Sequence, residues 1–226
     1  MDKLPANEKE AWEKVEGMLG EEQISLAKHW SFNILNDPKR LAFVLSRYKF
    51  AGKIGCANRS VIELGCSEGL GGVILAEKAS SYCGVDYDDD AVSVAKTNWT
   101  GPKYSFIQDD FLGKSYGTFQ TAVSLDVIEH IELEYEDLFF QTLSDNLVSN
   151  GRCIVGTPNK TSEVYASEPS KAGHVNVYTY DRLKAATQRY FKNVFMFGIN
   201  DEIVHTGFHA MCHYIVAVGC TKKEVS

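Results

Sequence analysis

The 226-residue sequence lacks an excess of basic residues, because 23 Lys and Arg stand against 30 Asp and Glu and give a net charge of −7. Nucleic-acid binding through phosphates depends on clustered Lys and Arg. The charge balance therefore disfavours a nucleic-acid partner and favours a small or neutral one.

The sequence also lacks a run of about 18 consecutive apolar residues, and residues 1–17 have no basic region leading into an apolar core. We therefore expect no membrane span, no secretory signal and a cytoplasmic protein. The six cysteines show no CxxC spacing, which disfavours a zinc ribbon or a disulfide framework. With 44% hydrophobic and 23% charged residues, the chain has the composition of a globular protein.

Two regions are indicated by the hydrophobic pattern. From Glu8 to Tyr48, apolar residues at helical spacing predict helices, with a helix start near Asn36 to Pro38. We interpret residues 1–55 as an N-terminal helical lid and residues 56–226 as the main domain. No signal for an oligomeric state is present.

The main domain alternates short apolar strands with helical segments, which is typical of an α/β protein with a mostly parallel sheet. Seven strands are predicted, at 61–64, 82–85, 104–107, 122–125, 153–156, 194–197 and 214–218. Helices are predicted at 70–79, 91–98, 133–147 and 181–190. Because about 16 residues without helical pattern separate the last two strands, we expect them to form an antiparallel hairpin.

The first predicted strand runs into a turn of small residues, Gly65-Cys-Ser67-Glu-Gly69, and then into a helix. Such a turn lets the backbone and the helix N-terminal amides approach a ligand. The spacing is not GxGxxG, and Glu63 and Glu68 flank the turn, so it suits a cation better than a dinucleotide pyrophosphate. S-adenosylmethionine (SAM), which carries a sulfonium, is favoured over a nicotinamide cofactor.

Further candidate cofactor-binding residues lie at or just after the ends of the next two predicted strands. Asp86 is placed to accept hydrogen bonds from ribose hydroxyls, and Tyr87 could stack on adenine. Asp110 and the backbone amide of Phe111 could bind the adenine edge. Each feature alone also fits a tight turn or a helix cap. Their order and spacing together favour the cofactor site.

The segments ELGCSEG, GVDYDDD, IQDDF and SLDVIEH, in this order over about residues 60 to 220, resemble the class I, Rossmann-like SAM-dependent methyltransferases. Asn36, Pro38 and Arg40, the Glu129-His130 pair and His174 resemble the ubiquinone-pathway O-methyltransferases. The segment 47–50 and the overall length are similar to methyltransferases of bacterial surface-polysaccharide pathways.

The resemblance implies roles for individual residues. Glu63, Gly65 and Gly69 would line the methionine end of SAM, the backbone of Leu125 would lie near the sulfonium, and Arg40 would grip the carboxylate. Five extra residues separate Arg40 from the glycine turn, so Arg47 is its alternative. Ser67 stands where glycine is commonest and is less tolerant of positive φ.

A candidate for the reacting group follows the fourth strand, in Asp126-Val-Ile-Glu129-His130. This position lies at the carboxyl end of the sheet, where open α/β folds bind their ligands. His130 could act as the general base that removes the acceptor proton. A hydrogen-bonded histidine in a helix cap is the alternative interpretation.

Asp126, Glu129, His130 and the later His174 also suggest a divalent metal, because mixed carboxylate and imidazole ligands suit such an ion. The metal would hold vicinal hydroxyls and lower their pKa. Ubiquinone-type enzymes and small-RNA 2′-O-methyltransferases have a similar ExxEH arrangement with a later His. Here Asp126 is one methylene shorter, so the predicted ligands are Glu129, His130 and His174, with His130 and His174 as catalytic candidates.

The remaining histidines give weaker signals. His205, His209 and His213 recur every four residues, but Gly207 disfavours a helix, so a loop over the acceptor pocket or a polar surface is expected. His29 and Trp30 lie near the predicted lid, where they could touch substrate or pack in the core.

The sequence thus predicts a SAM-dependent methyltransferase acting on an oxygen of a small polar metabolite, such as a sugar-linked one of a capsule or polysaccharide pathway. The alternatives are N-methylation of a small amine or phosphorylated amine, metal-assisted methylation of a nucleic-acid or other macromolecular hydroxyl, and a catalytically silent SAM-binding partner.

Overall fold

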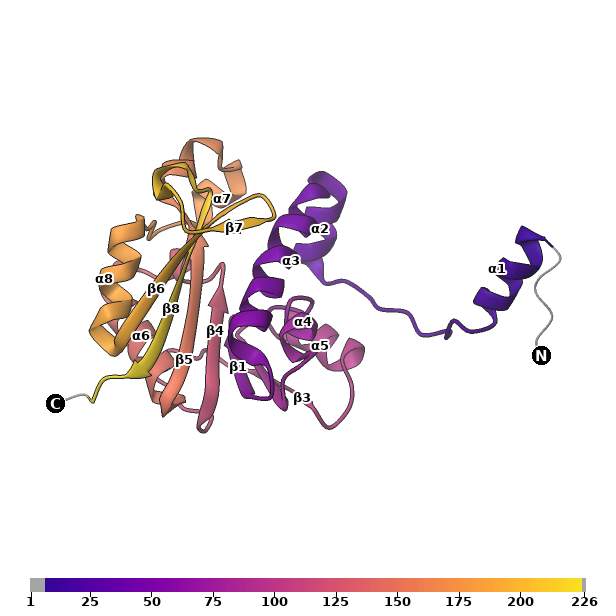
Figure 1. Cartoon of the computed structure of the whole chain (residues 1–226), viewed down its shortest axis with the longest axis horizontal. Helices are drawn as coiled ribbons and strands as arrows, with labels where there is room; N and C mark the ends of the chain where they lie inside the picture. The colour runs from indigo at the N-terminus through magenta and orange to yellow at the C-terminus, as the bar shows by residue number, and fades with distance from the viewer. Residues whose placement is uncertain (1–6, 225–226) are drawn as a thin grey trace.

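One eight-stranded sheet runs through the protein in the computed structural model, which describes residues 7–224 (Figure 1). Its strand order is β3-β2-β1-β4-β5-β8-β6-β7. The strands are β1 Ser60–Leu64, β2 Ser81–Asp86, β3 Tyr104–Gln108, β4 Phe119–Leu125, β5 Leu147–Pro158, β6 Phe191–Asn200, β7 Ile203–His205 and β8 Tyr214–Lys222. The first five pair in parallel, which confirms a mostly parallel sheet.

The C-terminal strands are antiparallel, as predicted, but they number three. Strand β8 pairs with both β5 and β6, and the short β7 pairs with the end of β6. The predicted count of seven is therefore corrected to eight. Strand β7 has only three residues, too few to show an alternating pattern, and its extended conformation depends on pairing with β6.

Helices cover both faces of this sheet (Figure 1). They are α1 Glu8–Glu16, α2 Lys28–Asn36, α3 Lys39–Ala51, α4 Gly72–Ala76, α5 Asp89–Asn98, α6 Glu136–Asp145, α7 Glu168–Gly173 and α8 Tyr180–Tyr190. Successive side chains of a strand point to opposite faces. In β1, Ile62 accordingly joins the core that contains α6 and α8, whereas Val61 joins the core that contains α2, α3 and α4.

The helical region before β1 is largely part of this core. Val44, Tyr48 and Ala51 of α3 are buried against the sheet and α4. A π-helical turn, Gly52–Cys56, follows α3 directly. Helix α1 differs, since it projects away from the body on an extended connector (Figure 1).

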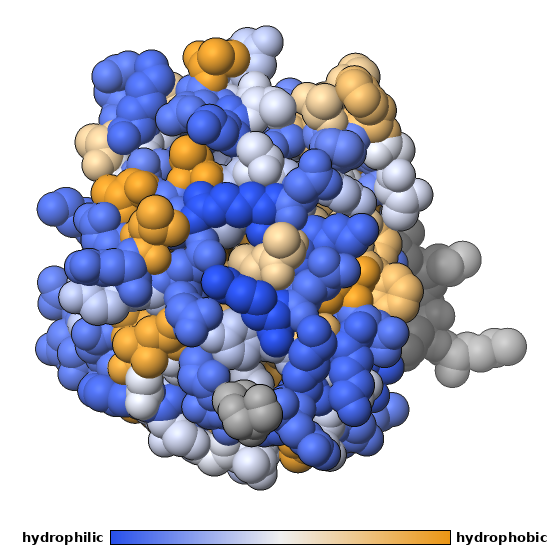
Figure 2. Space-filling view, turned by 90° about the vertical axis from the view of Figure 1, so that its left-hand side faces the viewer, coloured by the Kyte–Doolittle hydropathy of each residue, from blue (hydrophilic) through white to orange (hydrophobic). Residues whose placement is uncertain are grey.

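In the described part of the chain, no helix combines the length and the hydrophobicity needed to span a bilayer. The face that carries α8 is mainly hydrophilic, and its hydrophobic side chains occur in small separate groups (Figure 2).

Candidate active site

The turn between β1 and α4 has three residues with positive φ: Gly65 at 84°, Ser67 at 47° and Gly69 at 74°. A side chain at Gly65 would collide with Val127, and one at Gly69 with Trp99 and Phe106. Both glycines are therefore required for close packing as well as for backbone conformation. Ser67 adopts the left-handed conformation although it has a side chain. A hydrogen bond from its amide to Asp86, described next, stabilises this conformation.

Asp86 holds this turn against the end of β2. Its Oδ2 accepts a hydrogen bond from the Ser67 amide at 2.6 Å, and its Oδ1 accepts one from the Asp88 amide at 3.0 Å. The carboxylate is thus fixed between the glycine turn and the start of α5, at the carboxyl edge of the sheet.

A cavity of about 710 Å³ lies at this edge. It brings together six of the predicted cofactor residues: Gly65, Ser67, Asp86, Tyr87, Asp110 and Phe111. His29 and His130 also line it, whereas Trp30 is buried in the core. We call this space the cofactor cavity.

Four other predicted cofactor residues do not line the cofactor cavity: Arg40, Glu63, Gly69 and Leu125. Glu63 is fully buried, accepts a hydrogen bond from Tyr82 and lies near Tyr48, because strand alternation turns its side chain toward α3. Burial raises the pKa of Glu63 to about 7. Leu125 directly precedes Asp126, which does line the cavity.

Glu68 of the glycine turn anchors the start of α2. Its Oε1 accepts a hydrogen bond from the Ala27 amide at 3.0 Å, and nearby Asn98 exchanges two hydrogen bonds with the backbone of Ser25. Burial raises the pKa of Glu68, and its Oε2 is buried without a hydrogen-bond partner in the described structure. The carboxylate predicted to attract a cation therefore contacts the helical region instead.

A second cavity, of about 420 Å³, adjoins the first. Arg40, Arg47 and His174 line it, together with His213 and Tyr214. Asp126 lines both cavities. We call this second space the acceptor cavity, and Arg40 lies here instead of in the cofactor cavity.

Asp126 is held in a strained conformation between the two cavities, with φ at 59°. Its amide donates to the Gly156 carbonyl at 3.0 Å and to the Tyr214 hydroxyl at 3.1 Å. Arg47 donates to Asp126 Oδ1 at 2.7 Å, and its guanidinium lies 3.8 Å from the centre of the Tyr214 ring. Burial alone would lower the pKa of Arg47, but the Asp126 carboxylate outweighs it and the pKa is raised.

Glu129 lies buried just beyond Asp126, in a 3₁₀ turn, Ile128–His130. Thr157 donates a hydrogen bond to its Oε2 at 3.0 Å. Burial, with a contribution from the charge of Asp126, raises the pKa of Glu129 to about 8. The backbone carbonyl of Glu129 accepts hydrogen bonds from the amides of Val175 and Asn176, which brings the distant segment around His174 to this turn.

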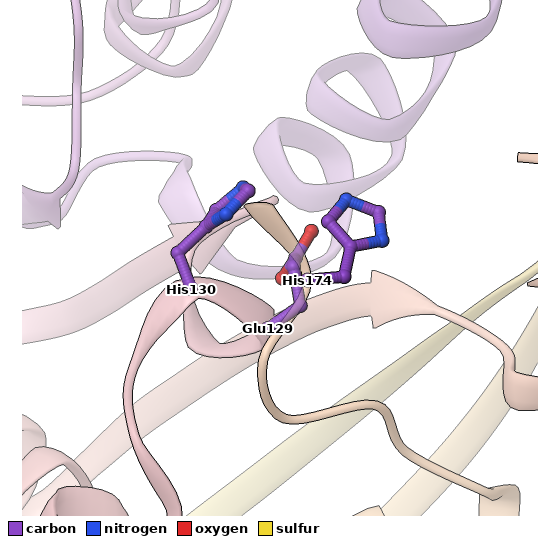
Figure 3. A group of neighbouring side chains, drawn as sticks. All are labelled: Glu129, His130 and His174. Atoms are coloured by element: carbon purple, nitrogen blue, oxygen red, sulfur yellow. The ribbon is translucent and has the colours of Figure 1, made fainter. Parts of the chain in front are cut away.

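His130 and His174 meet at this point, with ring centroids 5.1 Å apart. Since the Gly173 carbonyl can only accept, the His130 Nδ1 that lies 2.8 Å from it must carry a proton, and in the neutral ring Nε2 then keeps its lone pair free. Burial, followed by the charge of His130, lowers the pKa of His174. In the view of Figure 3, the Glu129 carboxylate lies between the two imidazole rings.

One potential ligand atom from each of Glu129, His130 and His174 lies within 4.8 Å of the others, so the predicted metal residues are brought together. Asp126 does not belong to this group. The donor set of one carboxylate and two imidazoles fits a divalent cation, and the carbonyl contact on His130 Nδ1 is the orienting interaction typical of a metal-ligating histidine.

The three C-terminal histidines do not converge. His205 Nε2 lies 2.7 Å from Asn200 Oδ1, and His209 stacks on Tyr180 with ring centroids 4.2 Å apart. Only His213 lines the acceptor cavity, where Asp201 lies 3.7 Å away.

Two contacts of the site were missed by the sequence analysis: Thr157 on Glu129 and Tyr214 on Asp126. They come from β5 and β8, 28 and 88 residues away in sequence from their partners. Ordinary strand residues at such separations carry no local signal.

The parallel sheet, its glycine turn and the acidic residue ending β2 define an α/β protein built to bind a nucleotide-like cofactor. A family model for a methyltransferase domain matches residues 37–194, which is more than half of the chain. The chain belongs to this methyltransferase-domain family. The predicted class, a class I SAM-dependent methyltransferase, is confirmed.

Two curated relatives are similar over part of their length. A probable S-adenosylmethionine-dependent methyltransferase of Mycobacterium tuberculosis is 31% identical over 107 residues, 46% of this chain and 38% of that protein. The mitochondrial ubiquinone biosynthesis O-methyltransferase of Arabidopsis thaliana is 29% identical over 143 residues, 58% of this chain and 44% of that protein. The chain thus spans less than half the length of either relative.

A solved structure shows the same fold. The TehB-like SAM-dependent methyltransferase of Corynebacterium glutamicum matches with a TM-score of 0.63 at 18% identity, covering 86% of this chain and 99% of that chain. At this identity the likeness concerns the fold alone.

Proposed function

We propose that the protein transfers the methyl group of SAM to an oxygen of a small polar acceptor. The observation that supports this most directly is the meeting of two cavities at Asp126, with His130 on the cofactor side and His174 on the acceptor side. Methyl transfer is an in-line displacement, so the donor and the acceptor must approach from opposite sides of one point.

In this proposal Asp86 binds the ribose, Tyr87 and Phe111 contact the adenine, and Asp110 accepts from its amino group. The glycine turn lies at the methionine end. Arg47 is already paired with Asp126, and Arg40 lines the acceptor cavity, so neither is assigned to the cofactor carboxylate.

His130 is the proposed general base. Its Nδ1–H is held by the Gly173 carbonyl, so Nε2 is the nitrogen that can accept a proton from the acceptor hydroxyl. The lowered pKa of His174, caused first by burial, favours the neutral imidazole, which can accept a hydrogen bond or serve as a ligand.

With a divalent metal in place of this base, Glu129, His130 and His174 would hold the ion, and the His130 Nε2 would then be a ligand instead of a proton acceptor. The metal would polarise the acceptor hydroxyl and lower its pKa. Thr157 orients the Glu129 carboxylate, and the Gly173 carbonyl orients His130.

Support for O-methylation comes from the plant relative, which is named an O-methyltransferase. A sugar-linked acceptor of a surface-polysaccharide pathway is the particular case that we propose from the sequence resemblance. N-methylation of a small amine is the second candidate, because an amine acceptor needs no strong base.

The test is methyl transfer from labelled SAM into a cell extract, separated into small-molecule and polymer fractions, with and without a chelator. We expect label in the small-molecule fraction and reduced labelling after chelation. Label confined to polymer would contradict the small acceptor, and labelling that the chelator leaves unchanged would contradict the metal. SAM binding without any label would favour a catalytically silent partner.

A further inference from the structure

Helix α1 is amphipathic, and its apolar side is uncovered. Trp12 and Val15 share one face, and Met18 and Leu19 continue it in the following turn. Their exposed fractions are 66%, 41%, 71% and 68%, and no residue of α1 is buried. An isolated helix of nine residues is marginal in water even with favourable sequence, so α1 requires a partner surface.

The connector between α1 and α2 carries α1 away from its own body (Figure 1). The chain first attaches to the body at Ser25 and Ala27, through Asn98 and Glu68. The connector, residues 17–27, has its two glycines, Gly17 and Gly20, next to α1. From residue 21 to residue 27 it is not helical and contains no Gly or Pro, so this part leads away from the body without reversing direction. This connector therefore favours a partner outside the body from which it leaves.

A groove of suitable shape lies elsewhere on the body, between α3, the end of α4 and β7. It has a volume of about 750 Å³, and its apolar lining includes Leu45, Phe50, Ile74 and Val204. Along α3 the lining extends from Ala42 to Phe50, about 12 Å of helix at 1.5 Å per residue, and it continues into the π-helical turn at Gly52 and Lys53. Helix α1, with nine residues, is about 12 Å long by the same rule.

The charges of the two surfaces are complementary. Helix α1 carries four Glu and two Lys. The charged residues that line the groove are three lysines, Lys49, Lys53 and Lys78, and two glutamates, Glu77 and Glu202. None of the three lysines has a carboxylate within salt-bridge distance among residues 7–224. The acidic character of α1 also disfavours an anionic membrane as its partner.

We propose that α1 of one chain docks into the α3/α4 groove of a second copy, and that the second copy returns its own α1 in the same way. The exchange closes a two-fold symmetric dimer, because each chain supplies both the helix and the groove. Trp12 is the anchor, since a buried aromatic side chain contributes most to contacts of this kind.

The test uses the full chain and two variants, measured by light scattering and sedimentation over micromolar concentrations. Trp12→Glu damages the helix and leaves the groove intact, whereas the double variant Lys49→Glu, Lys53→Glu damages the groove and leaves the helix intact. We expect the unaltered chain to be a dimer and each variant to be a monomer. Lys96→Glu, an exposed lysine of α5 outside the groove, is the matched control and should remain a dimer.

A mixture of the two variants distinguishes docking of α1 into the groove of a second copy from docking of α1 into the groove of its own chain. In an exchanged dimer the mixture retains one intact contact, so it should form a heterodimer weaker than the unaltered dimer but stronger than either variant alone. A mixture that stays monomeric contradicts the exchange, and so does an unaltered chain that is monomeric. A dimer that survives both variants would place the interface elsewhere. Native far-UV circular dichroism and cooperative unfolding of each variant exclude misfolding as the cause, and no outcome depends on methyl transfer.

Discussion

Asp86 shows how much can depend on a single side chain. Its two oxygens hold the Ser67 and Asp88 amides, and we propose that the same carboxylate accepts the ribose hydroxyls of SAM. Asp86→Ala should therefore weaken SAM binding by about 10- to 100-fold, the value of one hydrogen bond to a charged group. Calorimetric titration with SAM measures this. Asp89→Ala, in the first turn of α5, is the control, and equal affinities of the two variants would contradict the ribose assignment.

The prediction for His130 concerns the rate of methyl transfer and not the affinity for SAM. His130→Ala should lower turnover by more than about 100-fold, because it removes the Nε2 that serves either as the base or as a metal ligand, while SAM affinity changes little. Single-turnover methyl transfer and SAM titration measure the two effects. His209→Ala, whose ring stacks on Tyr180 outside both cavities, is the matched control. A mild effect of His130→Ala on turnover would favour N-methylation, which needs no strong base.

At the scale of elements, α6 and α8 fix the segment that carries His174. Glu136 of α6 accepts hydrogen bonds from Tyr178 and from Arg182 and Arg189 of α8. Burial alone would raise the pKa of Glu136, but these donors outweigh it and the pKa is lowered. Arg182 also donates to Asn176 Oδ1 at 2.6 Å and to the Val177 carbonyl at 2.8 Å. This network therefore positions His174 against Glu129.

Arg182→Met should consequently lower turnover by about 10-fold and raise the KM for the acceptor, while SAM affinity stays unchanged, because a small misplacement of reacting groups is costly. Steady-state kinetics with each substrate varied separately would show the difference. Arg189→Met is the matched control, since Arg189 also contacts Glu136 but has no contact with segment 176–177 in the described structure. Equal losses from both substitutions would indicate a purely structural network.

At the scale of the whole molecule, buried carboxyl groups make stability depend on pH. The pKa of Glu63 is raised to about 7 and that of Glu129 to about 8, so the folded protein holds protons that the unfolded chain releases near pH 4.5. The unfolded state therefore binds fewer protons between these values, and the free energy of unfolding falls as pH rises through this window.

Glu63→Gln removes the contribution of one of these groups. The free energy of unfolding of the unaltered protein, minus that of this variant, should fall by about 2 kcal/mol between pH 5.5 and pH 8. This value follows because one pKa unit corresponds to about 1.36 kcal/mol. Urea unfolding of both proteins at the two pH values measures the difference. Glu134→Gln, at an exposed position, should show no such change. A constant difference for Glu63→Gln would mean that Glu63 is charged in the folded state.

The arrangement of the whole molecule also shows what could be predicted. All seven predicted strands and the antiparallel end of the sheet are confirmed, because strand and helix periodicities are local properties of the chain. The sequence also allowed the prediction that Gly65, Ser67, Asp86 and Asp110 lie at one cavity, because parallel strands end at the same edge of the sheet.

The class of fold, the glycine turn and six of the residues that line the cofactor cavity could therefore be predicted from the sequence. The pairing of Arg47 with Asp126, 79 residues away, and the contact of Tyr214 with Asp126, 88 residues away, arise from tertiary packing. Tertiary packing likewise decided that β7 joins the sheet and that the two cavities meet between His130 and His174. Such contacts depend on how distant strands and helices pack together, and the spacing of residues along the chain does not encode that packing locally.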